Sequence, residues 1–532
     1  MRVLQHFSSS RNRQAVVVVL ALGVILASVI YREEIQSTAS HVTTFSFPIK
    51  TKTRPDATVT AISSNLSATE SSSTEKSAAI PTSIHPPEPL ATIENNHASY
   101  PRLAPLDMRG LDSLRERHLQ RIEDVISGNI PDYREWNVVQ LDGLKDHWLE
   151  VGANGRFEQP KVILSTYGCS TTGEVIWLES LMNAFREQKQ FFLYASYENI
   201  GKMYKSLDDI VTHVWSTDEH VIWCFNDTIS CVESPENPHG IPSWKIFTFT
   251  FWGSPQGWGN FMAPREPWSY NPLGGEWNLI PYVMPDKQFY LGYHYTGCTN
   301  LPYVPSGERK NQIAILAKRS EYFYKDTFLQ PEIWPILKNL TGLDLISVSN
   351  SEEGFPVRDA LTLLGPMERH DYDMMLVRGS SKALLGIGRP KISPSPYASL
   401  CRGVPVIIPY NGKICPARVE ESEWCGNHHQ HGPASRIGPP YVYTIDSQGP
   451  IEDIVGTIMT AVNTPIEPYV PPDMTEEALK RRIDDYFSID WKAYAMERMQ
   501  EKGWERVVTQ EFMYRWLAKH PVRKQRDKRS PL

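Results

Sequence analysis

The chain has 532 residues, a formal net charge of −7 and 41% hydrophobic residues. This length exceeds that of one ordinary domain, so we expect two or three domains. The hydrophobic content, which includes 15 tryptophans, is sufficient for large cores, and most of the chain should therefore fold. The acidic balance argues against a nucleic-acid partner, because nucleic-acid-binding domains usually carry a basic face.

Residues 15–31 form an uncharged, mostly apolar run that predicts a transmembrane signal anchor. Arg2, Arg11 and Arg13 precede the run, and positive charge on that side predicts a cytoplasmic N-terminus. We therefore expect a single-pass type II membrane protein, with a cytoplasmic tail at residues 1–14 and a luminal body. A cleaved signal peptide is the alternative interpretation of the same run.

Residues 32–100 are rich in Ser, Thr, Ala and Pro and predict a disordered stem, because such a composition buries too little apolar surface to fold. The order of anchor, stem and globular body is typical of Golgi glycosylation enzymes, and also of surface receptors and adhesins. Asn65, Asn226 and Asn339 open glycosylation sequons, which predicts N-glycans if the body is luminal.

The chain has seven cysteines, an odd number. Cys224 with Cys231, and Cys415 with Cys425, are close enough in sequence to be disulfide candidates in an oxidising lumen. The spacings do not match a zinc site, and buried free thiols are the alternative.

The first part of the body, residues 101–305, predicts a Rossmann-like domain with a helical neck at residues 108–126. Residues 161–168 are a β-branched apolar run that predicts a buried strand. A helix is predicted at 175–188 and a second strand at 191–196. Strand, turn, helix and strand in this order begin a Rossmann-like fold. The aromatic and Pro-rich segment from Asn226 to Leu273 is predicted to form long loops.

The second part, residues 306–490, predicts another Rossmann-like domain, followed by a C-terminal helix and basic tail at 491–532. Two such domains facing across a cleft define the α/β architecture called GT-B. The predicted strands are at 311–320, 343–349, 382–388, 404–410 and 441–446, and the predicted helices are at 371–380, 397–403 and 451–463.

Several of these segments resemble glycosyltransferase family 18, in the same order along the chain. That family contains the α-1,6-mannosylglycoprotein 6-β-N-acetylglucosaminyltransferases. The resemblance covers roughly residues 161–487 and is weak at 194–264. Its segments are the Gly-Glu helix start at 171–185, the Trp-Asn-Leu-x-Pro segment at 275–281, and residues 286–293, 384–413, 430–446 and 464–474.

The resemblance implies an inverting, metal-independent transfer of N-acetylglucosamine from UDP-GlcNAc to the 6-hydroxyl of a mannose, which forms a β-1,6 linkage on an N-glycan. Glu174 matches the family's catalytic base, which takes the proton of the acceptor hydroxyl. A position at a helix N-terminus favours the ionised carboxylate, although complementing the helix dipole could be its whole role. The implied partners are a UDP-sugar, a glycoprotein N-glycan and the Golgi membrane, with a luminal catalytic domain and no cofactor or metal.

The resemblance places the donor site in the second domain. Lys318 could supply the positive charge that a metal would otherwise give to the departing diphosphate. His431 could reach the diphosphate or the acceptor. The alternative for Lys318 is a solvated lysine at a strand end, and the alternative for His431 is a structural histidine. The donor-side candidates are Lys318, Gly388, Ser393, Pro394, Ser395 and His431, where the two serines lie in a loop that leads into a helix and the histidine belongs to a Gln-His pair.

Trp277 and Asn278 are the candidates for shaping the acceptor side, with core packing as the alternative for the tryptophan. The chain also departs from the family pattern at two positions. Ile392 and Ala398 stand where glutamates of the family's donor loop would fall, and the second is the kind of glutamate that holds a ribose. A replacement group, a different donor sugar or a weakened site would follow from this departure.

Asp371 and Asp373 spell the D-x-D motif of manganese-dependent glycosyltransferases, but the pair precedes an apolar helix, so we interpret it as a helix start. A hydrolase is a further possibility, for which no pair of carboxylates has a defined context. The alternative of a different class is a non-catalytic, membrane-tethered glycan-binding protein on the same fold, because fold does not determine function.

Overall fold

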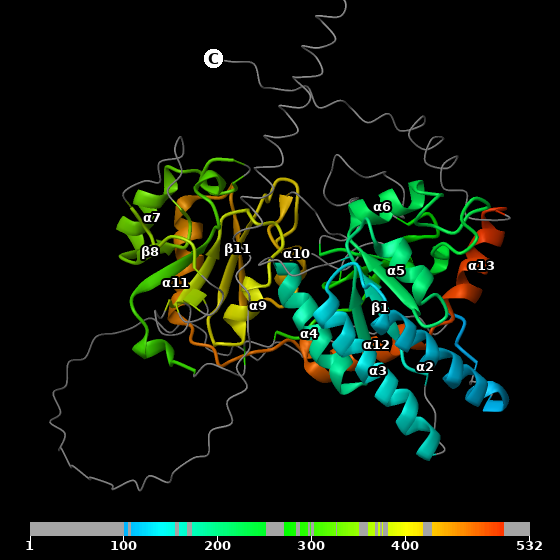
Figure 1. Cartoon of the computed structure of the whole chain (residues 1–532). Coiled ribbons are helices and arrows are strands. Elements are labelled where there is room, and N and C mark those ends of the chain that lie inside the picture. Colours follow the sequence, from blue (N-terminus) through cyan, green and yellow to red (C-terminus); the bar gives the residue numbers. More distant parts are fainter. Residues whose placement is uncertain are drawn as a thin grey trace, which may run out of the picture. The chain divides into compact units, whose positions relative to one another are not determined.

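The structure is a computed structural model (Figure 1), and all of its described residues belong to one unit of the chain, residues 84–532. The predicted anchor at 15–31, the stem up to residue 99 and Asn65 lie outside the described residues. Within the described part, none of the helices combines the length and the apolar character needed to cross a bilayer. The described residues are 100–104, 108–154, 159–166, 173–251, 271–283, 288–295, 298, 303–325, 327–350, 360–367, 371–372, 375, 381–418 and 428–504.

The first part of the body contains a six-stranded parallel sheet with the order β2-β1-β3-β4-β5-β6. Its strands are short and buried, as expected for a parallel sheet that is covered on both faces. The strands are β1 (Val162–Ser165), β2 (Phe191–Tyr194), β3 (His213–Ser216), β4 (Ile246–Phe249), β5 (Asn278–Ile280) and β6 (Phe289–Tyr290).

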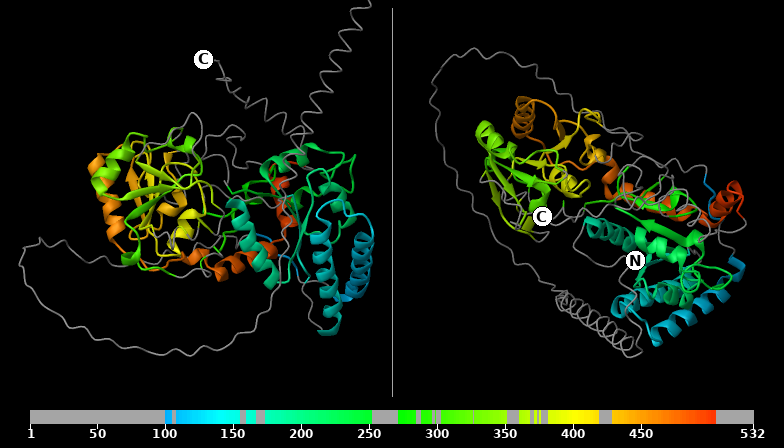
Figure 2. Two further views of the ribbon diagram at one scale, coloured as in Figure 1. Left: turned by 60° about the vertical axis from the view of Figure 1, so that its left-hand side comes forward. Right: turned by 90° about the horizontal axis from the view of Figure 1, so that it is seen from above.

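Alternate side chains of β1 enter two different cores, as the two-residue period of a strand requires. Val162 and Leu164 face a core that includes residues of α2, α3, α5 and α6, whereas Ile163 faces a core that includes residues of α4. Figure 2 shows α2 and α3 side by side on the first of these faces. The helices are α2 (Leu111–Ser127), α3 (Arg134–Asn154), α4 (Gly173–Glu187), α5 (Ile200–Ser206) and α6 (Asp218–Asn226).

The second part contains another six-stranded parallel sheet, with the order β12-β11-β10-β7-β8-β9. Helices α7 and α11 contribute to a core on one face of it. The strands are β7 (Gln312–Leu316), β8 (Asp344–Ser347), β9 (Leu361–Leu363), β10 (Ala383–Gly386), β11 (Val406–Tyr410) and β12 (Val442–Asp446), and the helices are α7 (Ile333–Thr341), α9 (Ser395–Leu400), α10 (Gly432–Ser435) and α11 (Ile451–Asn463).

The two parallel α/β sheets confirm the predicted fold class at this level, but the sequence missed several strands. The segment from Asn226 to Leu273 is not only loops, because it contains β4. Strand β9 was also not predicted. The helix predicted at 371–380 is described only at Asp371, Tyr372 and Met375, which are helical.

The end of the chain returns to the first sheet. Helices α12 (Glu476–Ser488) and α13 (Trp491–Glu501) belong to the core that contains Trp177 and Phe247. The hydroxyl of Tyr486 in α12 accepts a hydrogen bond from Nε1 of Trp215 in β3 at 3.0 Å. Helix α12 lies within the range that we expected for the second domain, although its packing is on the first sheet.

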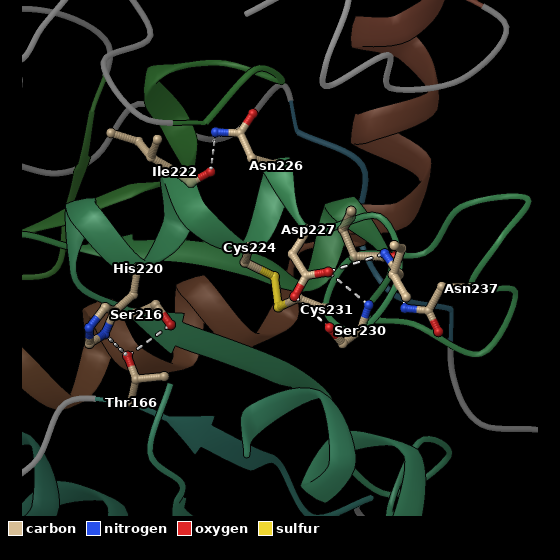
Figure 3. The surroundings of a disulfide bond; sticks show 12 residues. Thr166, Ser216, His220, Ile222, Cys224, Asn226, Asp227, Ser230, Cys231 and Asn237 are labelled. Carbon is tan, nitrogen blue, oxygen red and sulfur yellow. Dashed lines mark hydrogen bonds between the residues drawn. A yellow bond between two sulfur atoms is a disulfide. The ribbon is translucent and has the colours of Figure 1, made fainter. Parts of the chain in front are cut away.

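Two disulfides are formed by described residues. The bond between Cys224 and Cys231 closes a short loop after α6 and confirms the first candidate pair (Figure 3). A bond between Cys298 and Cys401 joins the segment after β6 to the end of α9. The two cysteines are 103 residues apart, so their pairing could not be predicted from sequence spacing. Cys415 is also disulfide-bonded, whereas Cys425 and Cys169 lie outside the described residues.

Asn226, at the end of α6, and Asn339, within α7, are both exposed. Exposure permits a glycan at either position in the folded protein. N-glycosylation of both stays a prediction.

We expect the two described disulfides to differ in their contribution to stability. Replacing Cys298 and Cys401 by serine should lower the free energy of unfolding by roughly 2–5 kcal/mol, because this bond closes the long loop in the unfolded chain. The matched Cys224→Ser, Cys231→Ser variant opens a loop with a separation of only 7 residues and should lose less. Thermal unfolding of the two double variants tests this, and an equal or reversed order would contradict it.

Candidate functional site

The strand order of the second sheet indicates, independently of any motif, where a ligand would bind. From β7 the chain builds the sheet outward through β8 and β9, and it then returns to the other side of β7 for β10, β11 and β12. The strand order therefore reverses between β7 and β10. Loops that leave the carboxyl ends of two such strands run in opposite directions, and the crevice between them is where open α/β sheets bind ligands.

Lys318 and Gly388 lie at this reversal. Leu316 pairs with Gly386 across the two strands, so Lys318 and Gly388 each follow the last paired residue by two positions. The side chain of Lys318 is exposed and makes no ion pair or hydrogen bond with another described residue. An unpaired cation at this position can bind an anionic group such as a diphosphate.

Gln430 holds the loop that contains Gly388, a role that the sequence interpretation overlooked. Its Oε1 accepts a hydrogen bond from the backbone N–H of Gly388 at 2.9 Å, and its Nε2 donates to the carbonyl of Pro390 at 3.0 Å. A Cβ on Gly386 would lie 2.1 Å from this Oε1, so only glycine leaves space for the amide. The signal in the sequence was the Gln-His pair, of which we had singled out only the histidine.

His431 is fully buried and holds the next part of the same loop. Its backbone N–H donates to the carbonyl of Lys391 at 2.8 Å, and its Nε2 donates to the carbonyl of Ser393 at 2.7 Å. Burial lowers the pKa of the imidazole to about 4, so the ring is neutral at physiological pH. These contacts give His431 a positioning role in the loop, which corresponds to the alternative of a structural histidine.

The hydroxyl groups of Ser393 and Ser395 are hydrogen-bonded to each other. Ser393 is buried, and its Oγ accepts from the backbone N–H of Ser395 at 3.2 Å and donates to Oγ of Ser395 at 3.0 Å. Pro394 is buried at the N-cap of α9. Five of the predicted donor-side residues therefore lie together: Gly388, Ser393, Pro394 and Ser395 in the segment that leads into α9, and His431 beside it. The two serines hold the start of α9 in place.

The two departures from the family pattern are both core residues. Ile392 is 1% exposed and Ala398 is 2% exposed. The carbonyl of Ala398 accepts a hydrogen bond from Nη1 of Arg402 at 2.6 Å. Apolar side chains at these positions therefore satisfy packing, and neither provides a carboxylate for a ribose.

The first sheet has its own reversal, between β1 and β3. Here Oγ1 of Thr166, which follows β1, donates to Oγ of Ser216 at the end of β3 at 3.0 Å. Nδ1 of His220 in α6 shares a hydrogen bond with the same Thr166 hydroxyl at 3.0 Å, and Figure 3 shows the three side chains converging. Helix α4 begins at Gly173 after the β1 loop, so Glu174 is in its first turn, while the Glu174 side chain lies outside the described residues.

Trp177 fixes the start of α4. Its Nε1 donates to the carbonyl of Gly292 at 2.8 Å, and its ring stacks on Phe249 with a centroid distance of 3.8 Å. The residue is fully buried. Because Trp177 is three residues after Glu174, this packing positions the turn of helix that carries the predicted base.

Aromatic contacts join the ends of the two sheets. Tyr282, two residues after β5, stacks on Tyr397 of α9 with a centroid distance of 5.5 Å. Its ring edge also meets His431 at 5.0 Å. Tyr282 and Tyr397 help to line a small pocket that Arg436 and Asp473 also border. The carboxyl edge of the first sheet therefore contacts α9 and His431, which supports the loop of residues 388–393.

Trp277 and Asn278 are fully buried, which agrees with the alternative of core packing for the tryptophan. Nε1 of Trp277 donates to the carbonyl of Trp244 at 3.1 Å, and the ring stacks on Tyr494 of α13 at 5.3 Å. A side chain without exposed surface cannot touch an acceptor directly, so Trp277 acts through the packing of its neighbours.

Asp371 is helical and its side chain is exposed, whereas Asp373 lies outside the described residues. No group of three or more His, Cys, Asp or Glu side chains in the described ranges is arranged to hold a metal ion.

No protein-family model matches the chain. The human protein named alpha-1,6-mannosylglycoprotein 6-beta-N-acetylglucosaminyltransferase A is 25% identical over 245 residues, which span 42% of this chain and 30% of the human protein. The proteins of the same name from Cricetulus griseus and Mus musculus match with the same identity and coverage. This similarity, although it spans less than a third of the relatives' length, supports a glycosyltransferase.

Among solved structures, the E. coli heptosyltransferase WaaC with ADP covers 61% of this chain and 99% of its own, at 12% identity and a TM-score of 0.26. The dodecameric iron-containing heptosyltransferase TibC, in complex with ADP-D-beta-D-heptose, covers 65% of this chain and 78% of its own, at 10% identity and a TM-score of 0.25. Both TM-scores are too low to assign a fold.

We expect a pH-dependent stability contribution from His431. The imidazole has a pKa of about 4 in the folded state and 6.5 as its ordinary value, so the unfolded state binds more protons between these values. Stability should therefore fall as the pH decreases, by about 2 kcal/mol from this residue between pH 7 and pH 5.

The test is urea unfolding of the wild type and of His431→Asn at pH 7 and pH 5. Asparagine tolerates the positive φ of this position, 51°, and does not titrate. The variant should lose less stability on acidification than the wild type. Equal losses would show that His431 does not resist protonation in the folded state.

Proposed function

We propose that the chain is an inverting, metal-independent glycosyltransferase that transfers N-acetylglucosamine from UDP-GlcNAc to the 6-hydroxyl of a mannose on an N-glycan. The observation that carries the proposal is the placement of Lys318 and Gly388 at the reversal of the second sheet. An unpaired cation and a glycine loop at that position suit the diphosphate of a nucleotide-sugar. The sequence similarity to a 6-beta-N-acetylglucosaminyltransferase adds the sugar and the acceptor.

The reaction would proceed as one displacement. The carboxylate of Glu174 takes the proton of the acceptor hydroxyl, and the oxygen attacks the anomeric carbon of the donor sugar from the face opposite the diphosphate. The new carbon–oxygen bond forms as the bond to UDP breaks, which inverts the anomeric configuration. The ammonium of Lys318 stabilises the negative charge that develops on the leaving diphosphate, a task that a metal performs in other enzymes.

The buried residues around the donor loop would keep it in shape without touching the reacting atoms. Gln430 and His431 fix the backbone of residues 388–393, and Ser393 fixes the start of α9. A preorganised loop binds its ligand without first losing conformational entropy. Signal anchoring through residues 15–31 and a luminal body in the Golgi would bring this site to the N-glycans of passing glycoproteins.

A second function has one observation in its favour. Ala398 places no carboxylate where the family pattern has one, and the residue is buried. A membrane-tethered protein that binds glycans without turnover would need no ribose contact. A transferase with a different donor sugar is also compatible with this change, and both are outcomes of the experiment below.

We expect Lys318 and Glu174 to control different steps. Lys318→Met should weaken UDP-GlcNAc binding by about tenfold or more, because it removes a charge-assisted contact worth roughly 1.5–3 kcal/mol. The matched control is Lys310→Met, which removes an exposed lysine at the other end of the same strand, β7, and should bind normally. Glu174→Gln should bind the donor normally but lower the transfer rate by roughly 10²–10⁴-fold.

The measurement combines donor titration by calorimetry with UDP release in the presence of a mannose-terminated N-glycan. If Lys318→Met and Lys310→Met bind UDP-GlcNAc equally, the donor site is wrongly placed. Glycan binding without UDP release in the wild type would favour the non-catalytic protein, and turnover with another UDP-sugar would reassign the donor.

We expect the transfer to proceed in excess EDTA at an unchanged rate, because the positive charge at the diphosphate comes from Lys318. UDP release before and after dialysis against EDTA measures this. Activity that disappears with EDTA and returns with Mn²⁺ would contradict a metal-independent mechanism.

A further inference from the structure

Three aromatic side chains form a cluster at the carboxyl edge of the first sheet. Tyr197 comes from the loop after β2, and His220 and Trp223 come from α6, which follows β3. The rings of Tyr197 and His220 are stacked with centroids 5.1 Å apart and an interplanar angle of 23°. Trp223 meets Tyr197 edge-on at 5.1 Å and lies 5.3 Å from His220. We call these three residues the aromatic platform.

The platform is open to solvent. Trp223 is 50% exposed, and Tyr197 and His220 are half-buried. The two neighbouring rings hold Trp223 in place, so it presents a fixed apolar face on which a ligand can stack.

The platform is continuous with the reversal of the first sheet. His220 shares its Nδ1 hydrogen bond with Thr166, and Thr166 donates to Ser216 (Figure 3), so His220 links the platform to the ends of β1 and β3, where the sheet reverses. The loop that leads to α4 and Glu174 begins at this same reversal, so the platform lies at the edge of the sheet from which that loop leaves.

The charges around the platform select the kind of ligand. Burial raises the pKa of Tyr197, and the negative charges of Asp227 and Glu198 raise it further, which places two carboxylates near the ring. Acidic neighbours disfavour a phosphate or a nucleic acid. A neutral sugar fits, because its C–H face packs on an aromatic ring while a hydroxyl donates a hydrogen bond to the exposed Glu198. Asp227 contributes its charge, since both of its oxygens already accept hydrogen bonds from residues 229 and 230.

We propose that Trp223 and Tyr197 form an acceptor subsite that stacks a neutral pyranose ring of the glycan, beside the sugar that reacts. The inference rests on the proposed transferase function, since it supplies the acceptor that the mechanism requires. It replaces the assignment of acceptor contact to Trp277, which is buried in the core.

Asn226, which opens a glycosylation sequon, lies next to the platform. It is three residues after Trp223 in α6, so the two side chains are neighbours on the helix surface. A glycan attached to Asn226 would begin beside the platform and could occupy it. All variants are therefore made in the Asn226→Gln background, which removes this competing sugar.

The test uses Trp223→Ala, with Trp223→Phe as the conservative variant and Leu149→Ala as the control. Leu149 is 55% exposed on α3, so its replacement removes a similarly exposed apolar side chain away from the platform. Each full-length variant is titrated with a mannose-terminated N-glycan in the absence of donor, by saturation-transfer NMR. The acceptor KM, the donor KM and kcat are then measured by UDP release.

Trp223→Ala should weaken glycan binding and raise the acceptor KM by roughly three- to tenfold, as expected for the loss of a stacked ring, with the donor KM and kcat unchanged. Trp223→Phe should recover most of the binding, and Leu149→Ala should behave as the parent. Glycan binding that is equal in Trp223→Ala and Leu149→Ala would overturn the proposal, as would a parent protein that binds no glycan.

The two proposals fail in different ways. If the parent protein releases no UDP but Trp223→Ala still loses glycan binding, the transferase function is wrong and the subsite stands. If UDP release and its acceptor KM are unaffected by Trp223→Ala, the transferase stands and the subsite is wrong.

Discussion

The arrangement of the candidate site depends on one constraint, the reversal of strand order within each parallel sheet. In both sheets the chain begins in the interior, builds one side and then crosses to build the other. The loops on either side of the reversal run apart and leave a crevice at the carboxyl edge. Lys318 and Gly388 flank one reversal, and the loop before Glu174 leaves the other. The proposed base and the proposed donor site are thus both consequences of topology.

The contacts of Tyr282 bring these two edges into one site. This residue follows β5 of the first sheet and packs on Tyr397 and His431. Tyr397 belongs to α9, and His431 holds the loop of residues 388–393 that leads into α9. The disulfide between Cys298 and Cys401 adds a covalent connection between the same regions. Helix α12 then returns the chain to the first sheet, where Tyr486 receives the indole N–H of Trp215. A transfer reaction needs donor and acceptor groups held together, and these contacts provide a physical basis for that.

The sequence predicted the strands whose apolar residues are contiguous, such as β1, β7, β10 and β11. It missed β4 and β5, because they are short and lie among tryptophans, prolines and glycines, and because their burial depends on α12 and α13 from far along the chain. Within the site, the positions of Lys318 and Gly388 followed from motif order. The role of Gln430 could not be predicted, since it depends on the fold bringing the segment after β11 against the loop after β10.

If the proposed function is correct, a nucleotide-sugar diphosphate binds at the reversal between β7 and β10. The most direct measurement is a crystal structure of the protein with UDP. The diphosphate should lie within hydrogen-bonding distance of Nζ of Lys318 and against the loop of residues 388–393. UDP bound elsewhere, with Lys318 still solvated and the loop unoccupied, would contradict it.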